Sequence, residues 1–199
     1  MEHTAHFRNR IIIGALFITA LLATLTLHAQ DKHVGAFVQG SKTLGFSIGF
    51  GVDYGYRVHG ERYTSFPAFA VSYDQGIVGN VGPGTIGLGG IFGIKSAFYE
   101  KDGFRYTWNN YIIGVRPTYH LTILSDKNSK FDPYAGVLLG VRSLRYRDDE
   151  NGPDPYRDRT YAAVGAFIGA KYNFTRGFGL FTEFGYDISL LRFGLNFNF

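Results

Sequence analysis

The last nine residues, Leu191-Arg192-Phe193-Gly194-Leu195-Asn196-Phe197-Asn198-Phe199, alternate strictly between large apolar side chains and side chains that are polar or glycine. A period of two predicts a β-strand with one apolar and one polar face. The same pattern recurs seven times upstream, and an even number of strands suits an up-and-down closed barrel. The predicted strands cover 44–53, 68–74, 86–95, 110–119, 136–142, 164–172, 180–186 and 191–199.

Turn signals and composition support an all-β chain. Asp102-Gly103 is the strongest hairpin signal, and segments rich in glycine, proline or aspartate separate the other strands. Glycine accounts for 27 of 199 residues and aromatic residues for 17%, which disfavours helices. The absence of cysteine excludes a disulfide scaffold, a cysteine-based zinc site and a lipid-modified N-terminal cysteine.

The small side chains on one face of the strands indicate which face points inward. Opposite the aromatic and branched residues, the strands carry mainly glycine, alanine, serine and charges. Glycine weakens an exposed strand, whereas small residues leave space in a narrow lumen that also holds a few long charged side chains. The apolar face then contacts lipid. The sequence therefore predicts an eight-stranded antiparallel up-and-down transmembrane β-barrel; a soluble, lipocalin-like barrel is the alternative.

The N-terminus is predicted to be a cleaved signal peptide. Arg8 and Arg10 precede seventeen uncharged positions, 11–27, and Ala29 follows as a small residue before Asp31. A basic segment, an apolar segment and a small residue near the exit are typical of export signals. We expect three parts: a signal peptide at 1–30, a periplasmic lead-in at 31–41 and the barrel at 42–199.

These features resemble the small eight-stranded outer-membrane β-barrel families of Gram-negative bacteria, in the OmpA/OmpX-like group. The C-terminal alternation is similar to the strand signature that the barrel-assembly machinery recognises, and the stretch from Asp132-Pro133-Tyr134 to Gly140 resembles a common strand opening. The resemblance implies an outer-membrane location, contacts with membrane lipid and lipopolysaccharide, and assembly by that machinery. The residues of the implied assembly signal are Leu191, Phe193, Leu195, Phe197 and Phe199.

Charged residues on the predicted inner face form the main candidate site. They are Asp53, Asp74, Lys95, Arg116, Arg142, Lys171, Glu183 and Arg192. A hairpin turn centred between Asp187 and Ile188 places Glu183 opposite Arg192, and a turn centred on Gly177 places Lys171 opposite Glu183. The three charges then form a rung across three strands, stabilised by attraction between facing partners. The rung either closes the lumen or acts as a gate whose pair exchange opens a small, porin-like pore.

Catalytic and cofactor motifs carry little weight in this chain. The Gly45-Phe46-Ser47-Ile48-Gly49 match to a nucleophile motif lies within an alternating strand, without the sharp strand-to-helix turn that the motif requires. His59, near Glu61 and Ser65, is the candidate general base for the alternative of an outer-leaflet lipid-modifying enzyme. We expect no enzymatic activity, cofactor, metal site or nucleic-acid partner.

The topology predicts which segments face outward. With both termini in the periplasm, loops 55–64, 99–106, 146–160 and 187–188 lie outside, and 146–160 mixes both signs of charge. Two classes of function remain open: a barrel with a structural or surface-interaction role, and a small pore or an outer-leaflet enzyme. The sequence names no external ligand.

Overall fold

A computed structural model describes residues 37–51, 64–101, 103–122, 130–148, 152–153 and 158–199. One compact unit, His33–Asn198, contains every strand. The strands are β1 (Lys42–Phe50), β2 (Thr64–Ser65), β3 (Ala68–Val81), β4 (Gly84–Lys101), β5 (Phe104–His120), β6 (Phe131–Asp148), β7 (Gly152–Pro153), β8 (Arg159–Asn173), β9 (Phe178–Tyr186) and β10 (Leu191–Asn198). Among the described residues, no helix is long and apolar enough to cross a membrane.

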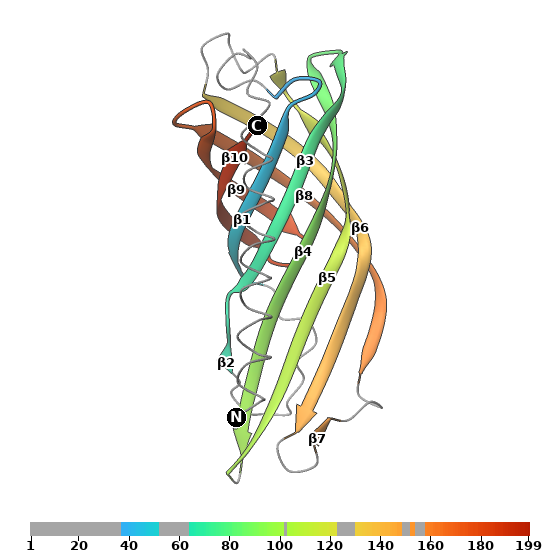
Figure 1. The fold of residues 1–199 in the computed structure, drawn as a ribbon. Helices are drawn as coiled ribbons and strands as arrows, with labels where there is room; N and C mark the ends of the chain where they lie inside the picture. Colours follow the sequence, from blue (N-terminus) through green and yellow to red (C-terminus); the bar gives the residue numbers. More distant parts are fainter. Residues whose placement is uncertain (1–36, 52–63, 102, 123–129, 149–151, 154–157) are drawn as a thin grey trace, which may run out of the picture. The chain divides into compact units, whose positions relative to one another are not determined.

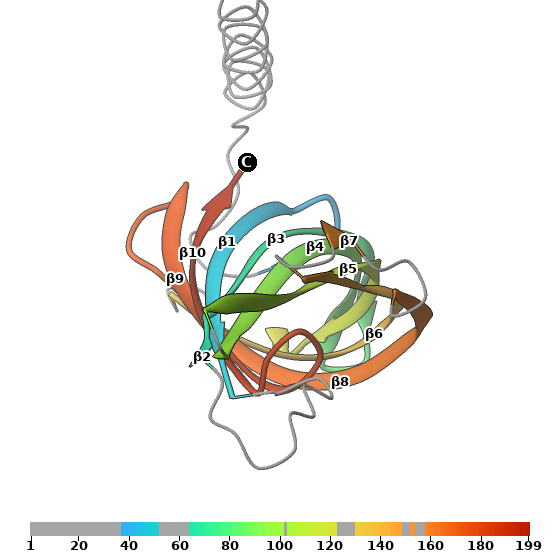
Figure 2. The same cartoon turned by 90° about the horizontal axis from the view of Figure 1, so that it is seen from below.

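Eight of these strands close into a ring. The order around it is β1–β3–β4–β5–β6–β8–β9–β10, and antiparallel pairing of β1 with β10 returns to the start. Figure 2 shows the strands encircling one lumen. The two short strands lie outside this ring order, β2 on β4 and β7 on β6. The predicted eight-stranded antiparallel barrel is therefore confirmed. Most of the strands are longer than the alternating segments that predicted them.

The strands differ greatly in length. β4, β5 and β6 have 18, 17 and 18 residues, whereas β9, β10 and β1 have 9, 8 and 9. We call the end where β1 begins and β10 ends the terminal end, and the opposite one the far end. β8 continues seven residues beyond its last pair with β9, Ala166–Tyr186, which is about 23 Å of strand. In Figure 1 the short strands occupy only part of the barrel's height.

The outer face is apolar and exposed, as the alternation predicts. Val164, Ile113 and Ile168 are 70%, 63% and 62% exposed, and the outward side chains of β10 are also exposed. Such surface in water would be unfavourable, but in a bilayer it is the lipid-facing band of a barrel. The inward positions, by contrast, are mostly buried.

An apolar layer crosses the lumen. Ile188, from the β9–β10 turn, is 1% exposed and packs with inward side chains of five strands. The other members of this layer are Ala68, Ala70, Ile91, Ile112, Leu138 and Ala163. Gly93 lies beside it, and a Cβ atom there would overlap the Cδ1 end of the Ile188 side chain, which would have to shift.

The prediction that 187–188 is an outer loop is wrong. Asp187 and Ser189 are 4% and 2% exposed, so the turn lies in the lumen with Ile188. The reason is the mismatch in strand length: β9 and β10 end well below the far end of their neighbours, and an apolar side chain at the turn gains by packing inside.

We predict that Val164→Lys destabilises the protein in a bilayer by about 2–4 kcal/mol, because it places a charge on the lipid-facing band. Urea unfolding in lipid vesicles measures the effect. Thr160→Lys is the matched control: Thr160 lies on the same outward face of β8, nearer the far end, beside Ser143. Equal losses from the two substitutions would contradict the assignment of the band.

Candidate functional site: the closed lumen

Seven of the eight predicted inner-face charges lie among the described residues, and all seven point into the lumen. Six are at most 7% exposed: Lys95, Arg116, Arg142, Lys171, Glu183 and Arg192. The side chain of Asp74 is 15% exposed. Asp53 lies outside the described residues, as do His33, His59 and the predicted signal peptide.

Glu183 is the centre of one ionic cluster. It lies opposite Arg192 in the β9–β10 pairing, which confirms that half of the predicted rung, and it forms an ion pair with Arg192. It also accepts a hydrogen bond of 2.8 Å from Arg116 Nη2 and one of 2.7 Å from the Tyr134 hydroxyl. Arg116 stacks on Phe167, with 3.9 Å from its Cζ atom to the ring centroid. Glu183 therefore links β5, β6, β9 and β10 across the lumen.

The other half of the rung is wrong. Lys171 lies opposite Phe181, and Gly169 takes the place opposite Glu183. The turn between β8 and β9 is centred on Arg176 and not on Gly177, because the amides of Phe174 and Thr175 both donate to the Phe178 carbonyl. The change moves the register by two positions, so Lys171 keeps its inward direction.

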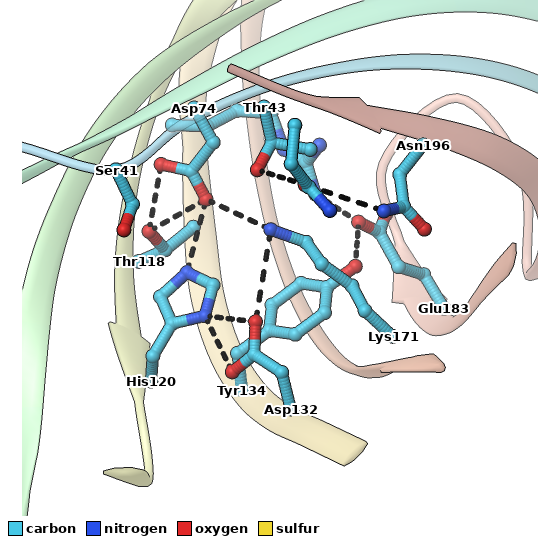
Figure 3. A network of polar contacts seen from close by, with 12 residues as sticks. Ser41, Thr43, Asp74, Thr118, His120, Asp132, Tyr134, Lys171, Glu183 and Asn196 are labelled. Carbon is cyan, nitrogen blue, oxygen red and sulfur yellow. Dashed lines mark hydrogen bonds and ion pairs between the residues drawn. The ribbon is translucent and has the colours of Figure 1, made fainter. Parts of the chain in front are cut away.

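Lys171 instead belongs to a second cluster, centred on His120 (Figure 3). The Nδ1 atom of His120 lies 2.9 Å from both carboxylate oxygens of Asp132, and Nε2 lies 3.0 Å from Asp74 Oδ2. Each ring nitrogen of His120 therefore faces a carboxylate, one from β6 and one from β3. Lys171 Nζ lies 3.9 Å from Asp74 and 3.8 Å from Asp132.

Phe37 covers this cluster at the terminal end. Its ring stacks on His120 at a centroid distance of 3.7 Å and an angle of 15°, and Lys171 Nζ lies 4.6 Å from its centroid. A tight turn holds the segment that follows: the Ser41 amide donates to the Val38 carbonyl, and Gly40 adopts a φ of 83°. Phe37 thus adds an aromatic cover over charges that the narrow lumen removes from water.

Sequence reasoning missed His120, Asp132 and Tyr134 as parts of the network. Each could have been found from the odd–even alternation along the strands. His120 lies on the same inward face of β5 as Arg116, and Asp132 lies on the same inward face of β6 as Arg142. Asp187 was also missed, and no parity rule applies within a turn. It lies 3.3 Å from Arg192, and Arg142 Nη2 donates to its backbone carbonyl at 2.7 Å.

Two further sets of predicted residues lie apart from these clusters. Lys95 is buried nearer the far end, opposite Asn110. The implied assembly signal lies on the outward face of β10, with Leu191, Phe193, Leu195 and Phe197 between 36% and 46% exposed. Its role in assembly stays a prediction. Within the described residues, no group of three or more histidine, aspartate or glutamate side chains could hold a metal ion.

The closed ring, the apolar outer face and the charged lumen together define a transmembrane β-barrel of eight antiparallel strands. Neither the protein-family models nor the curated proteins contain a match to this sequence.

A solved structure supports the fold, and two others are similar. Ail of Yersinia pestis, in complex with the heparin analogue sucrose octasulfate, aligns with a TM-score of 0.50 at 13% identity, covering 81% of this chain and 99% of Ail. The N-terminal β-barrel domain of Pseudomonas aeruginosa OprF aligns with a TM-score of 0.48 at 12% identity, covering 81% and 99%. OprG from the same organism aligns with a TM-score of 0.45 at 10% identity, covering 83% and 99%.

We predict that Glu183→Ala destabilises the barrel by about 3–5 kcal/mol, because Arg116 and Arg192 then lose their shared carboxylate while buried. Thermal and urea unfolding in lipid vesicles measure the loss. Glu100→Ala is the control, since it breaks only the exposed pair with Arg105, whose side chain is 52% exposed, and costs about 0–1 kcal/mol. A cost for Glu183→Ala as small as that of the control would contradict a structural role for the cluster.

Proposed function

We propose that this protein is a closed outer-membrane barrel with a structural or surface-interaction role and no enzymatic activity. The observation that carries the proposal is the double closure of the lumen, by the apolar layer around Ile188 and by the two ionic clusters. The terminal end faces the periplasm, and the far end faces outward.

The apolar layer is the stronger barrier to ions. Hydrophobic constrictions exclude water and block conduction even where the backbone leaves room. Ile188 fills the centre of the layer, while Asp187 holds the turn by accepting hydrogen bonds from the amides of Ile188 and Ser189. A closed lumen leaves the outer surface as the part of the molecule that meets a partner.

The environment of His120 supports the proposal that the protein has no enzymatic activity. His120 is fully buried, and both of its ring nitrogens contact carboxylates. It therefore has neither the access nor the free nitrogen that a general base needs.

We expect no measurable ion conductance for the wild-type barrel in planar bilayers, and measurable conductance for Ile188→Gly, which removes the side chain at the centre of the apolar layer. Leu190→Ala is the control, because Leu190 follows in the same turn but is 41% exposed. Wild-type conductance that depends on Glu183 would support the alternative function, a small gated pore, and would contradict closure.

The surface near the far end is polar and carries exposed guanidinium groups. On its outward face, Arg145 is 58% exposed and pairs with Asp158 at 2.7 Å, and Arg147 lies two positions further along β6. Hydrogen bonds from the Tyr146 amide and from Arg145 lower the pKa of Asp158, so this carboxylate stays ionised at neutral pH. Arg105, on the neighbouring strand, adds a third exposed guanidinium.

Phosphate groups of lipopolysaccharide are the partner that this surface suits. Guanidinium groups bind phosphate through paired hydrogen bonds, and the outer leaflet presents such groups just beyond the apolar band. Biogenesis through the barrel-assembly machinery, by way of the outward face of β10, belongs to the same proposal.

We predict that the double variant Arg145→Gln/Arg147→Gln binds lipopolysaccharide about fivefold more weakly, if each exposed arginine contributes about 0.5 kcal/mol. Titration of the protein in nanodiscs with purified lipopolysaccharide measures the affinity at fixed salt. Arg176→Gln is the control, because Arg176 lies in the β8–β9 turn at the terminal end. Weakening of about twofold by the control, the share of one charge, would mean that net charge alone decides binding.

A further inference from the structure

A small cavity lies between the two ionic clusters inside the lumen. Its volume is about 20 Å³. It is bounded by members of both clusters, Lys171 and Asp74 from one and Arg116 and Glu183 from the other, together with Asn196 and Ser72. The cavity therefore lies where the clusters approach each other without direct contact between Asp74 and Glu183.

Three polar atoms on these walls have hydrogen-bonding capacity that the described protein groups leave unused. They are Lys171 Nζ, Arg116 Nε and Asn196 Oδ1. The Lys171 side chain is 6% exposed and Asn196 is fully buried, so bulk water does not satisfy them. The distances of 3.8 and 3.9 Å from Lys171 Nζ to its carboxylates are ion-pair distances, beyond hydrogen-bonding range.

The orientation of the Asn196 amide is determined by its neighbours. Its Nδ2 atom donates to Asn173 Oδ1 at 2.8 Å and to Asn198 Oδ1 at 3.3 Å. Its Oδ1 atom accepts no hydrogen bond from the described protein groups. The residues around the cavity therefore offer unused donors as well as an unused acceptor.

We propose that this cavity is the binding site of a single ordered water molecule that joins the two ionic clusters. A water needs about 10–15 Å³ and two to four polar partners, and the cavity supplies both. The water accepts hydrogen bonds from Lys171 of one cluster and Arg116 of the other, and it donates to Asn196. The cavity walls carry equal numbers of carboxylates and cationic side chains. Such a site favours neither a bare cation nor a halide, whereas a water molecule can both donate and accept hydrogen bonds.

The water gives Lys171 a role that its ion pairs alone do not explain. Contacts across more than 3.5 Å between charged groups are often completed by a bridging water, at little cost in free energy. Through it, Lys171 couples the cluster of His120 to the cluster of Glu183. The site does not depend on whether the barrel conducts ions or binds lipopolysaccharide.

A crystal structure of the wild-type barrel at high resolution tests the site directly. We expect one peak of water density within about 3.2 Å of Lys171 Nζ. An empty cavity in well-ordered density would overturn the proposal. Crystals soaked in bromide distinguish the ligands, because an anomalous peak in the cavity would assign it to a halide and would also overturn the proposal.

Two variants test the coupling in solution. Ser72→Val adds apolar volume at the cavity wall, and we expect it to displace the water and lower the melting temperature although it fills space. Ser47→Val is the matched control, an inward serine of β1 whose hydroxyl donates to the Ala70 carbonyl and which does not bound the cavity. A higher melting temperature for Ser72→Val, with the control unchanged or lowered, would mean that the cavity is better filled than hydrated, against the proposal.

Discussion

The structure depends on one constraint: a backbone in lipid must pair all its polar groups within the protein. The chain meets the constraint by joining its first barrel strand to its last. Eight residue pairs, from Thr43–Asn198 to Phe50–Leu191, close the ring between β1 and β10. Once the ring is closed, each strand has one face toward lipid and one toward the lumen, and the alternation of side chains follows from that division.

Closure of a narrow ring then determines the chemistry inside. Charges in the lumen are removed from bulk water, so each needs partners at close range. The two clusters provide them: Glu183 for two arginines, and Asp74 and Asp132 for His120 and Lys171. Small inward residues are equally necessary, since long charged side chains and the Ile188 turn occupy the space they leave.

The fold was predictable because membrane barrels repeat one simple rule. The alternation in 191–199 and its seven counterparts placed all eight strands, and hairpin arithmetic paired Glu183 with Arg192 correctly because the β9–β10 pairing is symmetric about 187–188. Lys171 was paired wrongly because the centre of a turn depends on local hydrogen bonds, here those to the Phe178 carbonyl. The position of His120 between two carboxylates was not predictable in the same way. It depends on the register of several strands around the ring, whereas the odd–even alternation of one strand shows only which side chains point inward.

The ionic network and the apolar layer depend on each other. A turn buried inside a barrel leaves amide and carbonyl groups without solvent, which is unfavourable unless side chains satisfy them. Asp187 accepts hydrogen bonds from the amides of Ile188 and Ser189, and Arg142 donates to the Asp187 carbonyl. Arg192 pairs with Asp187 and connects the turn to Glu183. The charges therefore hold in place the turn that carries the apolar plug, so neither layer of the closure is independent of the other.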